Sequence, residues 1–289
     1  MRVFILGATG SIGQSIVLEL KGRGHEVVAL ARSDISEANL VAQNIEIIRG
    51  DLRDPAGWVK IIHEIDAIIH VAATFTDDMG FVDHHLVETL IAEAEPAGRK
   101  IRFIYTGGCW LFGETGDEIA TEESVFNPPS DFEQTIENSQ LLFDASCFDT
   151  IVIHPASVYH RDGGVVSRFL SSAQELGRVE VWGSLQTRWS VVHREDLARA
   201  YLLVLEQGQI GQSYCVAAET GVWVSDMVAA VSQRFKLNSE PWIREVSEVV
   251  AEHGEWASGP AIDQQMSGSK IMNTLGWAPI YNNILSEIG

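Results

Sequence analysis

The chain has 289 residues, 46% of them hydrophobic and 21% charged, and its formal net charge is −20 at pH 7. This length allows one large domain or two small ones with a substantial core, and the composition is that of a globular protein rather than a disordered one. The acidic excess argues against binding to nucleic acid or to an anionic membrane, because phosphate groups would be repelled over most of the surface.

The remaining bulk features exclude several other classes. The three cysteines, Cys109, Cys147 and Cys215, show no CxxC spacing, so we expect neither a disulfide framework nor a metal site. The first apolar run is too short for a signal peptide, and no stretch approaches the roughly 18 apolar residues of a membrane span. A cytoplasmic location is therefore expected.

The first half of the chain alternates short β-branched runs with helical patterns. Strands are predicted at 2–6, 25–31, 45–49, 66–72, 101–106 and 150–155, and helices at 11–23, 55–64, 80–95 and 131–146. Most of the strands are apolar throughout, as expected when helices cover both faces of a parallel sheet. This alternation predicts an α/β fold with a doubly wound parallel sheet of the Rossmann type.

The alternation ends near residue 155. Beyond it we expect helices at 165–176, 194–207, from Ser225 and near 243–253, short strands at 179–182 and 189–193, and a further short element at 213–217. We predict a dinucleotide-binding domain at 1–155, to which 189–216 returns, and a smaller α+β substrate lobe at 156–289. Six of the eight tryptophans fall in this lobe. They form either a compact aromatic core or, in part, the wall of an apolar substrate pocket.

The strongest motif is GATGSIG, which follows the first predicted strand and places Gly7, Gly10 and Gly13 before a helix. One glycine permits the tight turn, one lets the backbone approach a pyrophosphate, and one allows close contact between helix and strand. The helix N-terminus offers free N–H groups and the positive end of its dipole to phosphate oxygens. The pattern predicts a dinucleotide site.

The end of the second predicted strand bears on the choice between NADP and NAD. Arg32 lies there, with Ser33 beside it and Asp34 just beyond. An arginine can pair with the 2′-phosphate of NADP, whereas an acidic residue accepts hydrogen bonds from the ribose hydroxyls of NAD. Arg32 favours NADP, and Asp34 leaves NAD open.

These motifs resemble those of the short-chain dehydrogenase/reductase superfamily, in particular the extended type that includes nucleotide-sugar epimerases and dehydratases. The likeness spans nearly the whole chain: GDLRDP (50–55), HVAAT (70–74), YTGGCWLFG (105–113), HPASVY (154–159), WSVVHREDLARA (189–200) and SGSKIMNTLGWAP (267–279) accompany the glycine turn. The implied cofactor contacts come from Gly7, Thr9, Gly10, Ser11, Ile12, Gly13, Arg32, Ser33, Asp51, Leu52, Ala72, Ala73, Thr106, Pro155, Ala156 and Val158. The resemblance also implies a homodimer through the helices at 80–95 and 131–146.

The chain departs from this family at the residues that handle protons. The family uses a Ser or Thr after the fifth strand and a Tyr and Lys in a YxxxK motif; the corresponding positions here are Gly108, Phe132 and Ile136. No tyrosine of the chain has a lysine four residues later. The chain therefore resembles the atypical branch, which keeps the cofactor fold without this pair. Because a positioned acid or base typically accelerates a reaction by about 10²–10⁴-fold, we do not expect the family's usual mechanism to run at its usual rate without these groups.

Other side chains could replace the missing groups, because ligands of such sheets lie beyond the carboxyl ends of the strands. Asp78 follows the fourth predicted strand, and a carboxyl group in an apolar pocket can acquire a raised pKa and act as an acid. Tyr159 follows the sixth. A solvated loop acid and a packed tyrosine are the alternative interpretations of these two candidates.

The leading hypothesis is an NADP-binding oxidoreductase or epimerase/dehydratase-like enzyme acting on a small, weakly polar molecule. Dispersed arginines in the second lobe argue against a nucleotide-sugar diphosphate. One alternative is a non-enzymatic NADP(H) sensor, which would explain why all three catalytic groups are missing together. Another is a catalyst that uses the same cleft without a cofactor.

Overall fold

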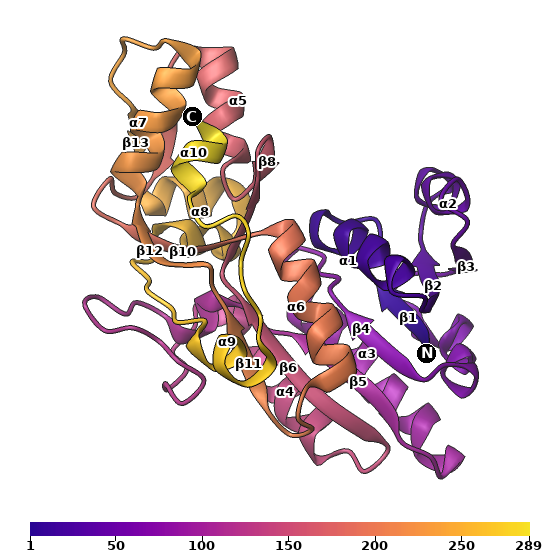
Figure 1. Cartoon of the computed structure of the whole chain (residues 1–289). Coiled ribbons are helices and arrows are strands. Elements are labelled where there is room, and N and C mark those ends of the chain that lie inside the picture. Colours follow the sequence, from indigo (N-terminus) through magenta and orange to yellow (C-terminus); the bar gives the residue numbers. More distant parts are fainter. The chain divides into compact units, whose positions relative to one another are not determined.

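The largest sheet of the computed structural model, which describes residues 1–289, has seven strands in the order β11-β6-β5-β4-β1-β2-β3 (Figure 1). The strands are Arg2–Leu6 (β1), Glu26–Ala31 (β2), Glu46–Arg49 (β3), Ala67–His70 (β4), Ile101–Thr106 (β5), Phe148–Pro155 (β6) and Ser213–Val216 (β11). Strands β1 to β6 pair in parallel. The predicted doubly wound Rossmann sheet is confirmed.

Alternation along β1 explains how helices cover both faces. Phe4 and Leu6 belong to the core formed with α3, α4 and η2, whereas Val3 and Ile5, equally buried, point to the opposite face. The helices of this part are Ser11–Gly22 (α1), Asp34–Val41 (α2), Met79–Ala94 (α3) and Glu133–Asp144 (α4), with short 3₁₀ turns at Pro55–Gly57 (η1), Val59–Glu64 (η2) and Glu95–Ala97 (η3). None of the helices in the structure combines the length and apolar character that a membrane span requires.

Two elements of the first half differ from the predictions. The helix expected at 55–64 is a pair of 3₁₀ turns, η1 and η2, joined at Trp58. The indole of Trp58 donates to the carbonyl of Asp51 across 2.8 Å and is buried, so its anchoring interrupts a continuous α-helix. Helix α2 was not predicted, because Leu40 is its one buried residue and leaves no apolar periodicity to detect.

The chain divides into two compact units. The first comprises Met1–Gly107, Glu133–Ile153 and Ala198–Ser213, and the second comprises Gly108–Phe132, His154–Leu197 and Tyr214–Gly289. The first boundary expected from the sequence, at residue 155, lies two residues from one of these borders. Residues 108–132, which the sequence placed in the dinucleotide-binding domain, belong to the second unit.

The second unit contains a four-stranded sheet of order β12-β10-β7-β8 and a two-stranded sheet, β13-β9. Its strands are Ser157–His160 (β7), Gly163–Gly164 (β8), Glu180–Trp182 (β9), Arg188–His193 (β10), Glu219–Trp223 (β12) and Trp242–Arg244 (β13). Its helices are Ser167–Leu176 (α5), Val224–Phe235 (α7), Val246–His253 (α8), Ser269–Leu275 (α9) and Ile284–Ile288 (α10), with 3₁₀ turns at Cys109–Phe112 (η4), Ser130–Phe132 (η5) and Glu255–Ala261 (η6). Helix Arg194–Gln207 (α6) begins in this unit and continues into the first.

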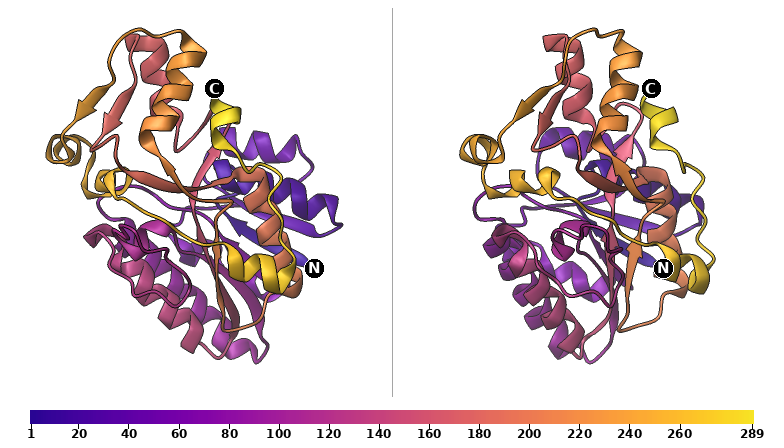
Figure 2. Two further views of the ribbon diagram at one scale, coloured as in Figure 1. Left: turned by 60° about the vertical axis from the view of Figure 1, so that its left-hand side comes forward. Right: turned by 90° about the vertical axis from the view of Figure 1, so that its left-hand side faces the viewer.

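Helices α5 and α7 lie side by side over this unit's core (Figure 2). The core includes Phe169, which stacks on Trp189 at a centroid distance of 5.4 Å. The helix expected near 243–253 is shorter, because residues 242–244 form β13 and pair in parallel with β9. This pairing places Arg244 opposite Trp182. Both side chains line the same cavity.

Candidate functional site

The turn from β1 to α1 is closed by glycines that no other residue could replace without movement. Gly7 has φ = 94°, and a Cβ built on it would lie 2.8 Å from the backbone nitrogen of Ala72. A Cβ on Gly13 would lie only 2.0 Å from the carbonyl oxygen of Gly7. The N–H of Gly10 donates to that same oxygen across 3.0 Å. The turn therefore holds the start of α1 directly against the ends of β1 and β4.

The start of α1 carries backbone donors that the helix itself does not use. Its first intrahelical hydrogen bond runs from the N–H of Gln14 to the carbonyl of Gly10, across 3.1 Å. The preceding N–H groups, those of Ser11, Ile12 and Gly13, have no carbonyl within the helix to bind. The cap residue Gly10 supplies no side-chain acceptor, and the first turn holds no acidic residue. This end of the helix is thus suited to phosphate oxygens.

The end of β2 separates an unpaired arginine from a paired aspartate. Arg32 is exposed and makes no hydrogen bond or ion pair in the structure. Ser33 caps α2 by accepting a hydrogen bond from the N–H of Ser36 across 3.2 Å. Asp34 forms an ion pair of 2.9 Å with Arg49, which also binds Glu37. Arg32 is therefore available to an anionic ligand, whereas the carboxylate of Asp34 already has a cationic partner.

In the GDLRDP turn after β3, one carboxylate oxygen of Asp51 makes no hydrogen bond within the protein. The Oδ1 atom of Asp51 accepts a hydrogen bond from the N–H of Arg53 across 3.0 Å. A Cβ on Gly50 would lie 2.2 Å from the Trp58 ring, so the turn passes directly over this indole. Asp51 and Leu52 are both half-buried. No other hydrogen bond is made by the Asp51 carboxylate, so its second oxygen can accept one from a ligand.

The segment after β4 is supported by a network of polar side chains. The imidazole of His70 accepts a hydrogen bond from the N–H of Ala72 across 3.3 Å and contacts Asp83 across 2.7 Å. Asp83 also accepts hydrogen bonds from Tyr105 and Asn138. Ala72 and Ala73 are thereby held at the edge that carries the glycine turn. At the end of β5, the hydroxyl of Thr106 is 2.6 Å from that of Tyr201.

Three of the implied cofactor contacts, those of the segment 155–158, lie in the second unit. Pro155 and Ala156 are buried, and the N–H of Ala156 donates to the carbonyl of Val216 across 3.0 Å. Val158 is half-buried, and its carbonyl accepts a hydrogen bond from the N–H of Val165 across 2.8 Å. These bonds fix the backbone of the segment.

The three positions of the usual catalytic set have distinct surroundings. Gly108 has extended backbone (φ = 172°), and a Cβ built on it would meet no atom within 4 Å. Phe132 ends η5 and packs edge-on against Trp110 at a centroid distance of 5.4 Å. Ile136 is half-buried on α4. A side chain at Gly108 would fit, whereas Phe132 forms part of an aromatic contact.

The environments of Asp78 and Tyr159 do not favour proton donation. Asp78 is exposed, and a hydrogen bond from Thr76 and an ion pair with Arg53 hold its pKa below the usual value. Tyr159 is fully buried, and burial raises the pKa of its phenol. Its hydroxyl lies 3.5 Å from the carbonyl of Tyr281. Both remain candidates for a catalytic role, and substitution can test them.

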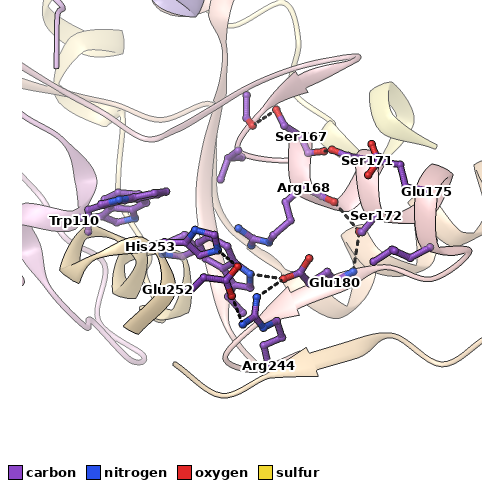
Figure 3. A pocket seen from close by; sticks show the side chains of 16 residues that line it. Trp110, Ser167, Arg168, Ser171, Ser172, Glu175, Glu180, Arg244, Glu252 and His253 are labelled. Atoms are coloured by element: carbon purple, nitrogen blue, oxygen red, sulfur yellow. Dashed lines mark hydrogen bonds and ion pairs between the residues drawn. The ribbon is translucent and has the colours of Figure 1, made fainter. Parts of the chain in front are cut away.

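A cavity of about 550 Å³ in the second unit was not anticipated as a whole from the sequence (Figure 3). Its lining includes three tryptophans, Trp110, Trp182 and Trp256, together with Arg168 on α5 and Arg244 on β13. Trp182 and Trp256 belong to the six tryptophans of the second lobe that the sequence offered in part as a pocket wall. The two arginines could not be assigned to the same cavity, because they are 76 residues apart and come together through tertiary contacts: α5 packs against β9, and β9 pairs with β13.

Comparison with protein families gives a match over most of the chain. The model of the NAD dependent epimerase/dehydratase family matches residues 3–217. A protein of Saccharomyces cerevisiae described as uncharacterized is 28% identical over 100% of this chain and 98% of its own length.

Solved structures with the same fold carry a nucleotide cofactor or a nucleotide sugar. The chain is similar to dTDP-glucose 4,6-dehydratase of Bacillus anthracis in complex with NAD, with a TM-score of 0.83 and 15% identity over 99% of this chain and 94% of that one. It is also similar to UDP-glucose 4-epimerase of Thermotoga maritima with UDP-glucose, with a TM-score of 0.82 and 18% identity over 99% of this chain and 96% of that one. At these identities the likeness establishes the fold alone.

Proposed function

Because the chain belongs to the NAD-dependent epimerase/dehydratase family, with the fold of the extended short-chain dehydrogenases/reductases, we propose that it is an oxidoreductase or epimerase/dehydratase-like enzyme that uses NADP. Its substrate is a small molecule of low polarity. The observation that carries the choice of cofactor is the contrast at the end of β2 between Arg32, which has no partner, and Asp34, which is paired with Arg49.

The pairing of β1 with β2 supports this assignment. The two strands run in parallel with Ile5 opposite Ala29, so Arg32 follows β2 at the edge of the sheet where Gly7 follows β1. A dinucleotide whose pyrophosphate lies on the glycine turn would extend its adenosine ribose towards that edge. A 2′-phosphate there would meet a free guanidinium. The ribose hydroxyls of NAD would instead need a carboxylate that Arg49 already engages.

The proposed cofactor residues would each bind a different part of the dinucleotide. Backbone N–H groups at the start of α1 would bind the pyrophosphate, Arg32 and Ser33 the ribose phosphate, and Asp51 the adenine amino group. When bound, the cofactor would supply or accept hydride. The chain's own contribution would be positioning, which can carry much of the rate when a polarised C=C or C=N bond accepts the hydride. Protons would come from water, Asp78 or Tyr159.

Titration with NADPH and NADH, followed by cofactor fluorescence, tests the cofactor assignment. We expect NADPH to bind more tightly than NADH, and Arg32→Ala to weaken NADPH binding by about tenfold to a hundredfold, because a charge-assisted pair contributes about 1.5–3 kcal/mol. NADH binding should change little. Arg23→Ala is the matched control, since Arg23 lies at the opposite end of α1 and pairs with Glu206. Equal losses for both cofactors would contradict the assignment.

Single-turnover oxidation of bound NADPH separates an enzyme from a cofactor sensor. A panel of enones, imines and aldehydes is mixed with the NADPH complex, and the decay of the reduced nicotinamide is followed. Oxidation that depends on one class of acceptor supports the enzyme. Tight NADPH binding with no oxidation by any of them would favour the sensor, which the replacement of the Tyr and Lys by Phe132 and Ile136 makes the second candidate. With turnover in hand, Asp78→Asn and Tyr159→Phe identify whether either residue transfers a proton.

A further inference from the structure

The cavity of the second unit contains an arginine with buried donors that lack hydrogen-bond partners. Arg168 reaches from α5 into the cavity (Figure 3), where its guanidinium carbon lies 3.8 Å from the ring centroid of Trp182. Its Nε and Nη2 atoms are buried and have no hydrogen-bond partner. Burial lowers the pKa of Arg168 to about 10, so the side chain is still a cation at neutral pH. A buried donor without an acceptor is unfavourable, and an acceptor on a ligand can relieve it.

The other arginine of the cavity is already neutralised. Arg244 binds Glu252 across 2.6 Å and Glu180 across 3.3 Å. Glu180 also accepts a hydrogen bond from the indole of Trp182 across 2.8 Å, and it makes no hydrogen bond to Arg168. Of the two arginines, Arg168 alone therefore lacks an acidic hydrogen-bond partner.

The side chains that line the cavity favour a ligand with a flat, apolar ring. Trp110, Trp182 and Trp256 line the cavity together with Val165, Leu176 and Pro260. The serines of α5 have no free hydroxyl proton to donate to a ligand. The hydroxyls of Ser167, Ser171 and Ser172 each donate to a main-chain carbonyl of their own segment. The principal charged donor left for a ligand is thus the guanidinium of Arg168.

We propose that this cavity binds a planar aromatic molecule that carries a single carboxylate, with the carboxylate on Arg168 and the ring among the tryptophans. A planar guanidinium matches a carboxylate in shape as well as in charge. A nucleotide diphosphate fits less well, because its greater negative charge would face Glu175, Glu180 and Glu252 in the same cavity. The proposal deepens the proposed function by narrowing its substrate to a mostly apolar molecule with one charged group, and it rests on that function in this respect, but the binding step needs no cofactor.

Calorimetric titration without cofactor tests this directly with four probes: 3-phenylpropionate, its neutral amide, hexanoate and UDP-glucose. We expect 3-phenylpropionate to bind at least tenfold more tightly than the amide, which lacks the charge, and than hexanoate, which lacks the ring. Arg168→Met should remove the preference for the carboxylate over the amide. Arg178→Met is the matched control, because Arg178 also lies over a tryptophan, Trp242, but does not line the cavity.

The outcomes separate this proposal from the cofactor assignment. Equal binding of acid and amide, no binding of either, or displacement of the acid by more tightly bound UDP-glucose would each overturn it. The comparison of probes on the unaltered protein decides the question even where Arg168→Met fails to fold. A chain that binds the aromatic acid but not NADPH would refute the cofactor assignment alone, and the reverse result would refute the cavity proposal alone.

Discussion

In the turn from β1 to α1, Gly13 is the residue that leaves least room for a side chain. A methyl group there would overlap the carbonyl of Gly7 and the Cα of Ala8, which would lie 2.0 and 2.9 Å away. Both are main-chain atoms, so neither can move aside by a change of rotamer. The requirement for glycine therefore comes from the contact between the helix and the strand end, and it holds with or without a ligand.

We expect Gly13→Ala to lower the free energy of unfolding by about 1–3 kcal/mol, the usual cost of overpacking, and to weaken dinucleotide binding because the donors of α1 are displaced. Urea unfolding and NADPH titration measure the two effects. Gly22→Ala in the same helix is the control: its added Cβ meets no atom within 4 Å, so stability should be unchanged or higher by up to about 1 kcal/mol. A stable Gly13→Ala protein would contradict the geometry of the turn.

Gly108, unlike Gly13, should tolerate a larger side chain. Its backbone is extended and its surroundings are open, so a side chain can be added without strain. We expect Gly108→Ser to unfold at the same urea concentration as the unaltered protein. A large loss of stability would show that the glycine is required by the fold, rather than being a position where the usual hydroxyl can be restored.

At the scale of the elements, a polar network joins β4, β5, α3 and α4. His70 and Tyr105 on the strands meet Asp83 on α3, which also accepts a hydrogen bond from Asn138 on α4. Burial raises the pKa of Asp83, but hydrogen bonds from His70, Tyr105 and Asn138 outweigh it and leave the pKa below its usual value. The ionised carboxylate therefore stabilises the folded state.

The pH dependence follows from the direction of this shift. A depressed pKa contributes stability that is fully present above the unfolded-state value, near 3.9, and is lost as the pH falls below it towards the folded-state value. We expect the free energy of unfolding to fall with acidification in that range, and to fall less steeply in Asp83→Asn. Urea unfolding at a series of pH values between about 3 and 7 measures both slopes. Parallel slopes would show that Asp83 is not responsible.

The elements that the sequence predicted well are those with strong periodicity. Strand β1, strand β5 and helix α6 have the predicted limits, because continuous apolar runs or an amphipathic repeat define them. Helix α2 and strands β7, β8, β12 and β13 were not predicted as separate elements. These are short or mostly exposed, so they are stabilised by pairing with distant segments that a local pattern does not show.

At the scale of the whole molecule, the net charge of −20 opposes folding through self-repulsion. Salt screens this repulsion, since the Debye length falls from about 30 Å at 0.01 M to about 3 Å at 1 M. We therefore expect the midpoint of thermal unfolding to rise between 0.01 and 0.5 M NaCl. Scanning calorimetry measures the change. A midpoint that falls with added NaCl would mean that attractive ion pairs, such as that of Arg188 with Asp263, outweigh the repulsion.

The sequence alone indicated the α/β class with six strands of the parallel sheet, the glycine turn and the family resemblance, because each appears as a local pattern of neighbouring residues. It also identified Arg32 at the end of β2, although not that Arg49 pairs with Asp34. Tertiary structure decided that pairing, the assignment of residues 108–132 to the second unit, and the cavity that brings Arg168 and Arg244 together. The physical reason is the same in each case: a side chain's charge and burial depend on partners that folding supplies from distant parts of the chain.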